Sequence, residues 1–241
     1  MAGAEKKTGS SAAGLRFLTL SAALLSPACA NAGAWIAPEH GQTIDNAAIT
    51  AREDGAAYEI SAYIEVPITA RISSVSTGWG EWAEADPTNG RTEATLGIKY
   101  AILRTEHAAM AVQAGAIWNI NPNEGCSEGG AEVRWLGGMN LSDRSFANLE
   151  IAARGLEGGA GCLGSRAELT LGHQFGSRWL GMGQAFVDSP LDGDDSIKVQ
   201  ASLVRFGADG RRGIQLGLRA RLDGGAPEPA LVLGLWRRLG D

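Results

Sequence analysis

The side chains best suited to catalysis in this chain are its three histidines, His40, His107 and His173. None of them lies at the spacing of a nucleophile motif or a metal-binding motif. His173 is the strongest candidate, because Thr170 and Gln174 lie close to it in the sequence. His173 also continues the apolar row of a predicted strand. The sequence predicts no serine on an adjacent strand whose register would bring it to His173. The sequence therefore predicts no enzyme, no cofactor and no metal, with lipid hydrolysis by a strand-borne serine and histidine as the catalytic alternative.

Charged side chains fall into two groups along the chain. Glu59, Glu65 and Glu93 come early, with Lys99 as a basic exception, whereas several later positions are basic. If the two groups face each other across a narrow interior, they create a transverse field that orients a dipolar or zwitterionic solute. The alternative is that opposite charges pair and fill the interior.

The residues predicted to line such an interior share alternate positions on predicted strands. They are Glu59, Glu65, Glu93, Lys99, Glu132, Arg134, Glu150, Arg154, Arg166, Glu168, Lys198, Arg219 and Arg221. Three pairs favour local ion pairing: Glu132 with Arg134, Glu150 with Arg154, and Arg166 with Glu168.

The elements that must position these charges are strands, because apolar residues recur at every second position. Along 211–223, for example, Ile214, Leu216 and Leu218 alternate with polar or small residues. This period of two is typical of β-strands, and helical periodicity is not competitive in any segment. The predicted strands are 43–52, 57–66, 69–79, 91–104, 108–119, 131–139, 146–155, 165–175, 178–188, 195–206, 211–223 and 229–238. About twelve strands of this length predict an all-β fold, a closed antiparallel transmembrane barrel.

The first residues have the order of a secretory signal peptide. Lys6, Lys7 and Arg16 precede an apolar run, after which small residues follow. We predict cleavage after Ala32, with Ala30 as the competing position. The chain then divides into a signal peptide, 1–32, and a single outer-membrane barrel domain, 33–241. A lipoprotein signal through Cys29 is a weaker alternative.

Charge and hydropathy exclude two other classes of protein. The formal net charge of −6 becomes about −8 after removal of the predicted signal peptide, and no basic run remains. Such a chain is a poor nucleic-acid binder. No later segment reaches the roughly 18 apolar residues of a transmembrane helix, so a membrane crossing requires strands.

The connections between predicted strands alternate in length. Those after even-numbered strands are tight, whereas most of those after odd-numbered strands are longer and polar. Short periplasmic turns and long outer loops are expected when both termini lie in the periplasm. Acidic loop residues could then meet divalent cations that bridge lipopolysaccharide; these are Glu81, Glu84, Asp86, Glu124 and Glu128. The acidic stretch from Asp192 to Asp195 lacks the spacing of a calcium loop, which favours a solvated loop.

Cys126 and Cys162 fall in two of the long loops on the predicted outer side. An even number of cysteines in an exported chain predicts a disulfide between them. The alternative is a pair of free thiols.

The apolar rows carry no charge, as a lipid-facing surface requires, although a sandwich core could look the same. Aromatic residues near strand ends predict two interfacial girdles. The predicted outer girdle contains Tyr58, Trp79, Trp118 and Phe186, and the inner girdle contains Phe146, Phe175, Trp179 and Trp236.

With its signal peptide, alternating strands, loop asymmetry and last strand from Ala230 to Trp236, the chain resembles outer-membrane β-barrel proteins of Gram-negative bacteria. The resemblance implies an outer-membrane location, contact with outer-membrane lipids, and insertion by the barrel assembly machinery. Such barrels commonly end at an aromatic residue that this machinery recognises, which assigns that role to Trp236. This chain departs from the pattern by continuing to Asp241.

Three functions are compatible with these features. The first is a small porin-like channel, or the membrane component of an envelope export system, that passes a small polar solute or a polysaccharide. The second is a non-conducting barrel whose disulfide-tied outer loops bind a partner. The third is a soluble exported β-sandwich that binds carbohydrate, for which Trp79 and Trp82 could stack on sugar rings.

Overall fold

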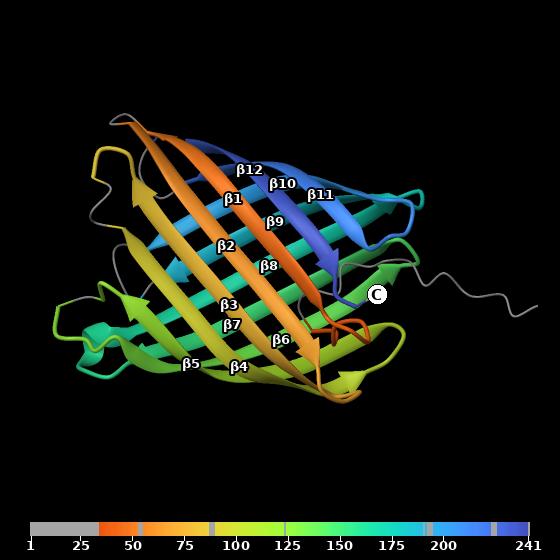
Figure 1. Ribbon diagram of the computed structural model, residues 1–241, viewed down its shortest axis with the longest axis horizontal. Coiled ribbons are helices and arrows are strands. Elements are labelled where there is room, and N and C mark those ends of the chain that lie inside the picture. Colours follow the sequence, from red (N-terminus) through yellow and green to blue (C-terminus); the bar gives the residue numbers. More distant parts are fainter. Residues whose placement is uncertain are drawn as a thin grey trace, which may run out of the picture.

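Twelve antiparallel strands form a closed barrel in the computed structural model (Figure 1). The structure describes residues 34–52, 55–86, 90–122, 124–189, 191, 195–222 and 226–240. The strands are β1 (Gln42–Arg52), β2 (Gly55–Pro67), β3 (Ile72–Ala83), β4 (Arg91–Arg104), β5 (Ala108–Ile120), β6 (Gly129–Ser142), β7 (Ser145–Leu156), β8 (Leu163–Phe175), β9 (Trp179–Ser189), β10 (Ser196–Phe206), β11 (Arg212–Arg221) and β12 (Glu228–Arg238). A short 3₁₀ helix, η1 (Ala160–Cys162), precedes β8.

Each strand pairs with its neighbours in the chain, and β1 closes the sheet by pairing with β12 from Gln42↔Arg238 to Thr50↔Ala230. The predicted closed barrel of about twelve strands is therefore confirmed, and the alternative of a β-sandwich is wrong. Within the described residues no helix is long and apolar enough to cross a bilayer. The predicted signal peptide lies outside the described residues, as do Asp192 and its neighbours up to residue 194.

The strand bounds differ most from prediction at β3. This strand begins at Ile72 because Ile68 and Thr69 turn the chain by donating backbone hydrogen bonds to the Ile72 carbonyl. It continues to Ala83 because its last residues pair with the start of β2, as in Tyr58↔Trp82. Glu81, predicted in a loop, therefore lies on a strand.

The two ends of the barrel differ in their connections. At one end, called the turn end, the connections are residues 68–71, 105–107, 143–144, 176–178 and 207–211. At the other, called the loop end, they include 84–90, 121–128, 157–162, 190–195 and 222–227. β1 starts at the turn end and β12 finishes there, so both ends of the described chain lie on the same side (Figure 1).

Alternation along each strand separates an apolar exterior from a polar interior. Large apolar side chains such as Ile214, Leu216 and Leu218 on β11 are more than half exposed, whereas Gln215 between them is buried. Because side chains on a strand point to opposite faces in turn, the register of the closed sheet fixes the exterior row of every strand.

The two predicted aromatic girdles are only partly correct. Tyr58 and Trp118 lie on exterior rows near the loop end, and Phe175 and Trp179 lie on exterior rows near the turn end. The other four aromatic residues lie on interior rows, because each is opposite a residue of an interior row on the adjacent strand: Trp79, Phe186, Phe146 and Trp236.

Candidate functional site

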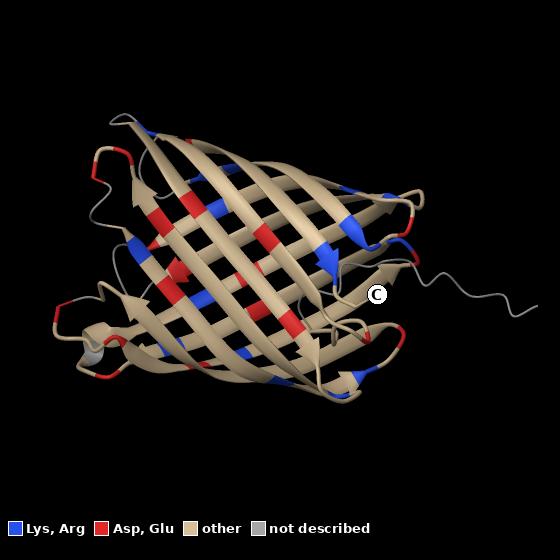
Figure 2. Ribbon diagram, viewed as in Figure 1, with Lys and Arg blue, Asp and Glu red and all other residues tan. Residues whose placement is uncertain are grey.

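The charged residues predicted for the interior occupy interior rows of β2, β4, β6, β7, β8, β10 and β11. Figure 2 shows acidic residues along the strands nearest the viewer and both basic and acidic residues on the strands behind them. Charges of both signs meet across the interior, because Glu132, Glu150 and Glu168 lie on the same side as the later basic residues. The separation of sign that the transverse-field hypothesis requires is therefore incomplete. The opposite charges are also close enough to pair, which narrows the interior.

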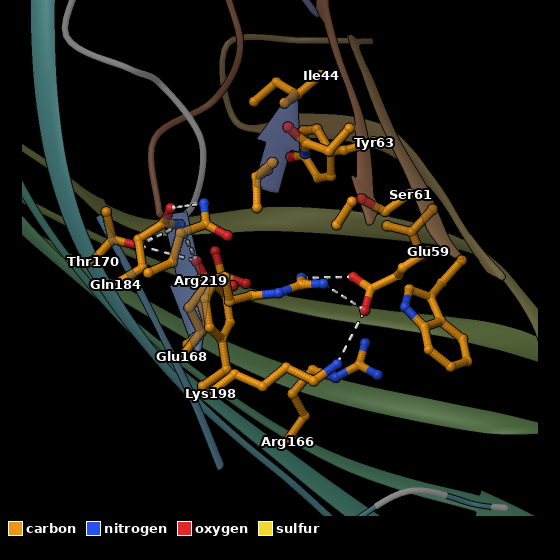
Figure 3. A pocket seen from close by; sticks show the side chains of 18 of the residues that line it. Ile44, Glu59, Ser61, Tyr63, Arg166, Glu168, Thr170, Gln184, Lys198 and Arg219 are labelled. Carbon is orange, nitrogen blue, oxygen red and sulfur yellow. Dashed lines mark hydrogen bonds and ion pairs between the residues drawn. The ribbon is translucent and has the colours of Figure 1, made fainter. Parts of the chain in front are cut away.

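The clearest cross-barrel contact joins Glu59 on β2 to β10 and β11 (Figure 3). Arg219 donates two hydrogen bonds to the Glu59 carboxylate, at 2.8 and 2.9 Å, and Lys198 Nζ donates another at 3.0 Å. β12 and β1 lie between β11 and β2 in the wall of the barrel, so the three side chains meet by extending through the interior rather than along the sheet. A two-pronged Arg–carboxylate contact is among the stronger types of ion pair.

A second cross-barrel network surrounds Arg154 on β7, whose side chain is 0% exposed. Its guanidinium contacts Glu93 on β4, Glu132 on β6 at 3.6 Å and Asp188 on β9 at 3.3 Å. Asp188 also accepts a hydrogen bond from Arg166 at 2.9 Å. This network fills the side of the barrel formed by β4 to β9.

The predicted local ion pairs hold in one case of three. Arg134 contacts Glu132 at 3.0 Å. Glu150 pairs with Arg134 on the adjacent strand, at 2.9 Å, rather than with Arg154. Arg166 pairs with Asp188 rather than with Glu168. The other two predictions failed because interior side chains also meet residues of the neighbouring strands, and the partners there are closer.

A cavity of about 300 Å³ occupies the middle of the barrel. Glu59, Lys198 and Arg219 line it and also line a smaller cavity of about 20 Å³ that lies near Arg52 and Glu228 at the loop end. The three-residue cluster therefore stands between the central cavity and the loop-end mouth. In that mouth Arg52 contacts Glu228 at 3.3 Å.

Glu81 and Trp79 on β3 complete the mouth on its other side. Glu81 contacts Arg52 at 2.7 Å and Arg91 at 3.1 Å. The guanidinium of Arg91 lies 5.4 Å from the centre of a Trp79 ring, within the range of a cation–π contact. Trp79 is thus an interior residue, while Trp82 stacks on Tyr58 on the outside with ring centres 5.9 Å apart.

A continuous track of hydrogen bonds lines the cavity across five adjacent strands, β8 to β12. Its first link runs from Gln184 Nε2 to Glu168 Oε1 at 3.1 Å, and its last runs from Trp236 Nε1 to Gln215 Oε1 at 2.7 Å. The sequence analysis missed these amides, although their alternation with apolar residues was the available signal. The members are Glu168, Thr170, Gln184, Gln200, Ser202, Gln215 and Trp236.

Apolar clusters flank the cavity at both ends. At the turn end, Phe146, Met182 and Trp236 pack together with Ile44, Leu180 and Val204 inside the barrel. At the loop end, Ile117, Leu156 and Leu191 pack with Cys162. The predicted disulfide between Cys126 and Cys162 is confirmed, with an S–S distance of 2.04 Å, and it ties two loop-end connections together.

His173 has a serine partner that the sequence analysis did not find. Ser145 lies opposite it in the β7–β8 register, and Ser145 Oγ is 2.8 Å from His173 Nδ1. The pair lies on an exterior row near the turn end, where the ring of Phe175 meets the imidazole edge-on at 4.7 Å. In the part of the chain described, no carboxylate pairs with His173, and no three metal-ligating side chains converge on one point.

No protein-family model and no curated protein matches the sequence. Solved structures match the fold. The KdgM porin shares 8% identity over 83% of this chain and 99% of its own, with a TM-score of 0.59. The NanC porin shares 7% identity over 82% and 100%, with a TM-score of 0.57. The COG4313 outer membrane channel from Pseudomonas putida F1 shares 13% identity over 85% and 98%, with a TM-score of 0.53. The chain has the fold of these outer-membrane barrels. The neighbours are porins and channels rather than enzymes.

Proposed function

We propose that this protein is an integral outer-membrane channel for small polar solutes, with its turn end in the periplasm. The closed barrel, the apolar exterior rows and the fold shared with porins support this location. Among the described residues, charge on those rows is confined to the turn end, where Asp45 pairs with Arg237 at 2.7 Å. Outer-membrane lipids would contact the exterior rows. Insertion by the barrel assembly machinery would use β12, although Trp236 points inward and is buried.

The observation that carries the channel proposal is the polar cavity between two narrower ends. A scaffold has no need of a hollow lined by amides and ion pairs, because well-packed apolar side chains could fill the same space without loss of stability. A narrow interior with charged and amide walls selects a solute by size and hydrogen bonding.

The charges favour neutral or cationic solutes over anions. Each basic side chain that lines the cavity is ion-paired: Arg134, Arg166, Lys198 and Arg219. Among the described residues the Glu168 carboxylate accepts hydrogen bonds only from neutral groups, Thr170 and Gln184. One KdgM porin structure is described as a complex with an acidic sugar, oligogalacturonate. Here a hydroxyl-rich solute without carboxylates fits the amide track better.

The test is ion selectivity in planar bilayers. Glu59→Gln frees Lys198 and Arg219 from their acidic partner, so the reversal potential in a salt gradient should shift towards anion selectivity. Glu106→Gln, in an exposed turn away from the interior, is the matched control and should leave selectivity unchanged. Conducting protein whose reversal potential is the same in wild type and in Glu59→Gln would contradict a channel lined by this cluster.

A second candidate, a non-conducting scaffold that binds a partner through its outer loops, is favoured by the disulfide and the apolar cluster at the loop end. Replacing both Cys126 and Cys162 with Ser would then abolish partner binding. In the channel proposal the same double variant keeps its conductance, since neither sulfur lines the central cavity.

A further inference from the structure

The segment before β1, residues 34–40, does not leave the barrel but turns back into its interior at the turn end. Ala34, Ile36 and Ala37 are buried, at 1%, 6% and 7% exposure. Ala34 packs with Ala109 and Ala111 of β5 and with Leu136 of β6, all on interior rows. The segment, called the strap, thus crosses from the wall at β5 and β6 to the start of β1.

The wall holds a polar anchor for the strap. Glu65 of β2 and Lys99 of β4 form an ion pair of 2.7 Å in which both side chains are 0% exposed. Lys99 Nζ also donates to the carbonyl oxygen of Trp35 at 2.8 Å, and the amide of Ala37 donates to Glu65 Oε1 at 3.1 Å. Two backbone groups of the strap are therefore satisfied by one buried ion pair.

β6, two strands from β4 in the wall, is shaped to receive the Trp35 ring. A Cβ atom at Gly138 on β6 would lie 2.1 Å from Trp35 Cζ3, so only a glycine leaves room for the indole. The same Cβ would lie 2.6 Å from Asn148 Oδ1, and Asn148 lines the central cavity. Trp35 of the strap therefore lies next to the wall of the cavity near the turn end, although no residue of the strap lines the cavity itself.

The anchor is complete without the strap. Glu65 also accepts hydrogen bonds from Ser73 Oγ and Tyr63 Oη, each at 2.6 Å, and both donors belong to the wall. If the strap left, the ion pair and these bonds would remain, and water could replace the two backbone groups. Release therefore leaves no buried charge without a partner.

The junction with β1 is suited to act as a hinge. Gly41 has φ of +92°, and a Cβ there would lie 2.4 Å from the Glu65 carbonyl oxygen. Its own carbonyl oxygen accepts a hydrogen bond from the Leu239 amide at 2.9 Å, which fixes the junction to the end of the chain. The strap can move about this point while β1 stays paired.

We propose that the strap is a gate that closes the periplasmic mouth of the channel and opens by leaving the Glu65–Lys99 anchor and the Gly138 recess. This inference rests on the proposed channel function. It explains why one half of the turn end is filled by side chains of the strands and the other half by a separate segment.

The first test is conductance of two variants that displace the strap differently. Deletion of residues 35–39 removes the gate, and Gly138→Leu expels the Trp35 ring while leaving the strap intact. Both should raise mean conductance about twofold or more above wild type. If the strap does not obstruct the channel, Gly138→Leu only adds a side chain to the interior, and its conductance should equal that of wild type or fall below it. Gly183→Leu, on an open exterior position, is the control for added bulk.

The second test does not depend on conductance. Cys126 and Cys162 are disulfide-bonded, and Cys29 lies in the predicted signal peptide and is replaced by Ser in every protein of this test. A cysteine at position 34 then adds a single free thiol. Ala34→Cys should resist a water-soluble maleimide, whereas Ala208→Cys in an exposed turn should react at once. Adding Gly138→Leu should make position 34 reactive.

The outcomes separate the gate from the channel. Equal conductance of wild type and both strap variants, all heat-modifiable on gels, overturns the gate and leaves the channel standing. Silence of all three overturns the channel and the gate with it. A position 34 thiol that reacts as fast as the position 208 thiol shows that the strap is not seated, and overturns the gate alone.

Discussion

At the scale of single residues, the interior of this barrel depends on buried charges that each have several partners. Arg154 is the clearest case, because its fully buried guanidinium lies against Glu93, Glu132 and Asp188. Arg154→Met should destabilise the barrel by about 3–5 kcal/mol, since it leaves buried carboxylates without their base. Urea unfolding in phospholipid vesicles measures this loss.

Arg144→Met is the matched control for that variant. Arg144 lies exposed in the turn between β6 and β7, so its replacement should change stability by less than about 0.5 kcal/mol. Equal effects of the two substitutions would mean that the buried network contributes little.

The residue scale is also where sequence reasoning was least complete. Alternation assigns Glu150 and Arg166 to a row of their strand, and the register of the closed sheet turns those rows inward. Alternation does not predict the ion-pair partners of these residues, because the partners depend on the stagger between strands and on contacts across the interior of the barrel. Glu59 meets residues more than a hundred positions away, which no local pattern indicates.

At the scale of elements, β4 and β5 pack unusually closely at Gly97↔Gly115. A Cβ atom at Gly97 would lie 2.6 Å from the Ala114 carbonyl oxygen and 3.0 Å from the Gly115 Cα atom. Backbone atoms cannot move aside as the end of a side chain can. Gly97→Ala should therefore lower the free energy of unfolding by about 1–3 kcal/mol. The same unfolding measurement in vesicles reports it.

Gly183→Ala on β9 provides the comparison, because nothing lies within 4 Å of a Cβ at that position. Its effect should be near zero or slightly stabilising, by up to about 0.5–1 kcal/mol, because alanine has less freedom to lose on folding. A cost as large as that at Gly97 would contradict the close packing of β4 and β5.

The number and order of strands could be predicted from alternation alone, since each strand carries its own period of two. The facing of aromatic residues near strand ends could not. Trp79 and Phe186 were assigned to the exterior by their position along the strand, yet their register puts them beside Glu93 and Lys198 inside. Whether a residue has an odd or an even position along its strand predicted its facing better than its distance from the end of the strand.

At the scale of the whole molecule, the strap shows what period-two reasoning cannot detect. Residues 34–40 carry no alternation, and their place is set by a recess at Gly138 and an ion pair from two other strands. Only the closed barrel brings these features together, so the strap could not be predicted from the sequence.

The exterior of the whole barrel gives the last prediction, because a lipid-facing surface tolerates charge only near the membrane interfaces. Leu216 lies midway along β11 and is 55% exposed, whereas Thr92 lies on an exterior row at the loop end of β4. In vesicles, Leu216→Arg should lower the free energy of unfolding by roughly 2–4 kcal/mol, and Thr92→Arg should lower it by roughly 0–1 kcal/mol. Equal, small costs for both would mean that lipid does not surround the middle of the barrel. The cost must therefore depend on depth if the exterior rows of these twelve strands face a bilayer.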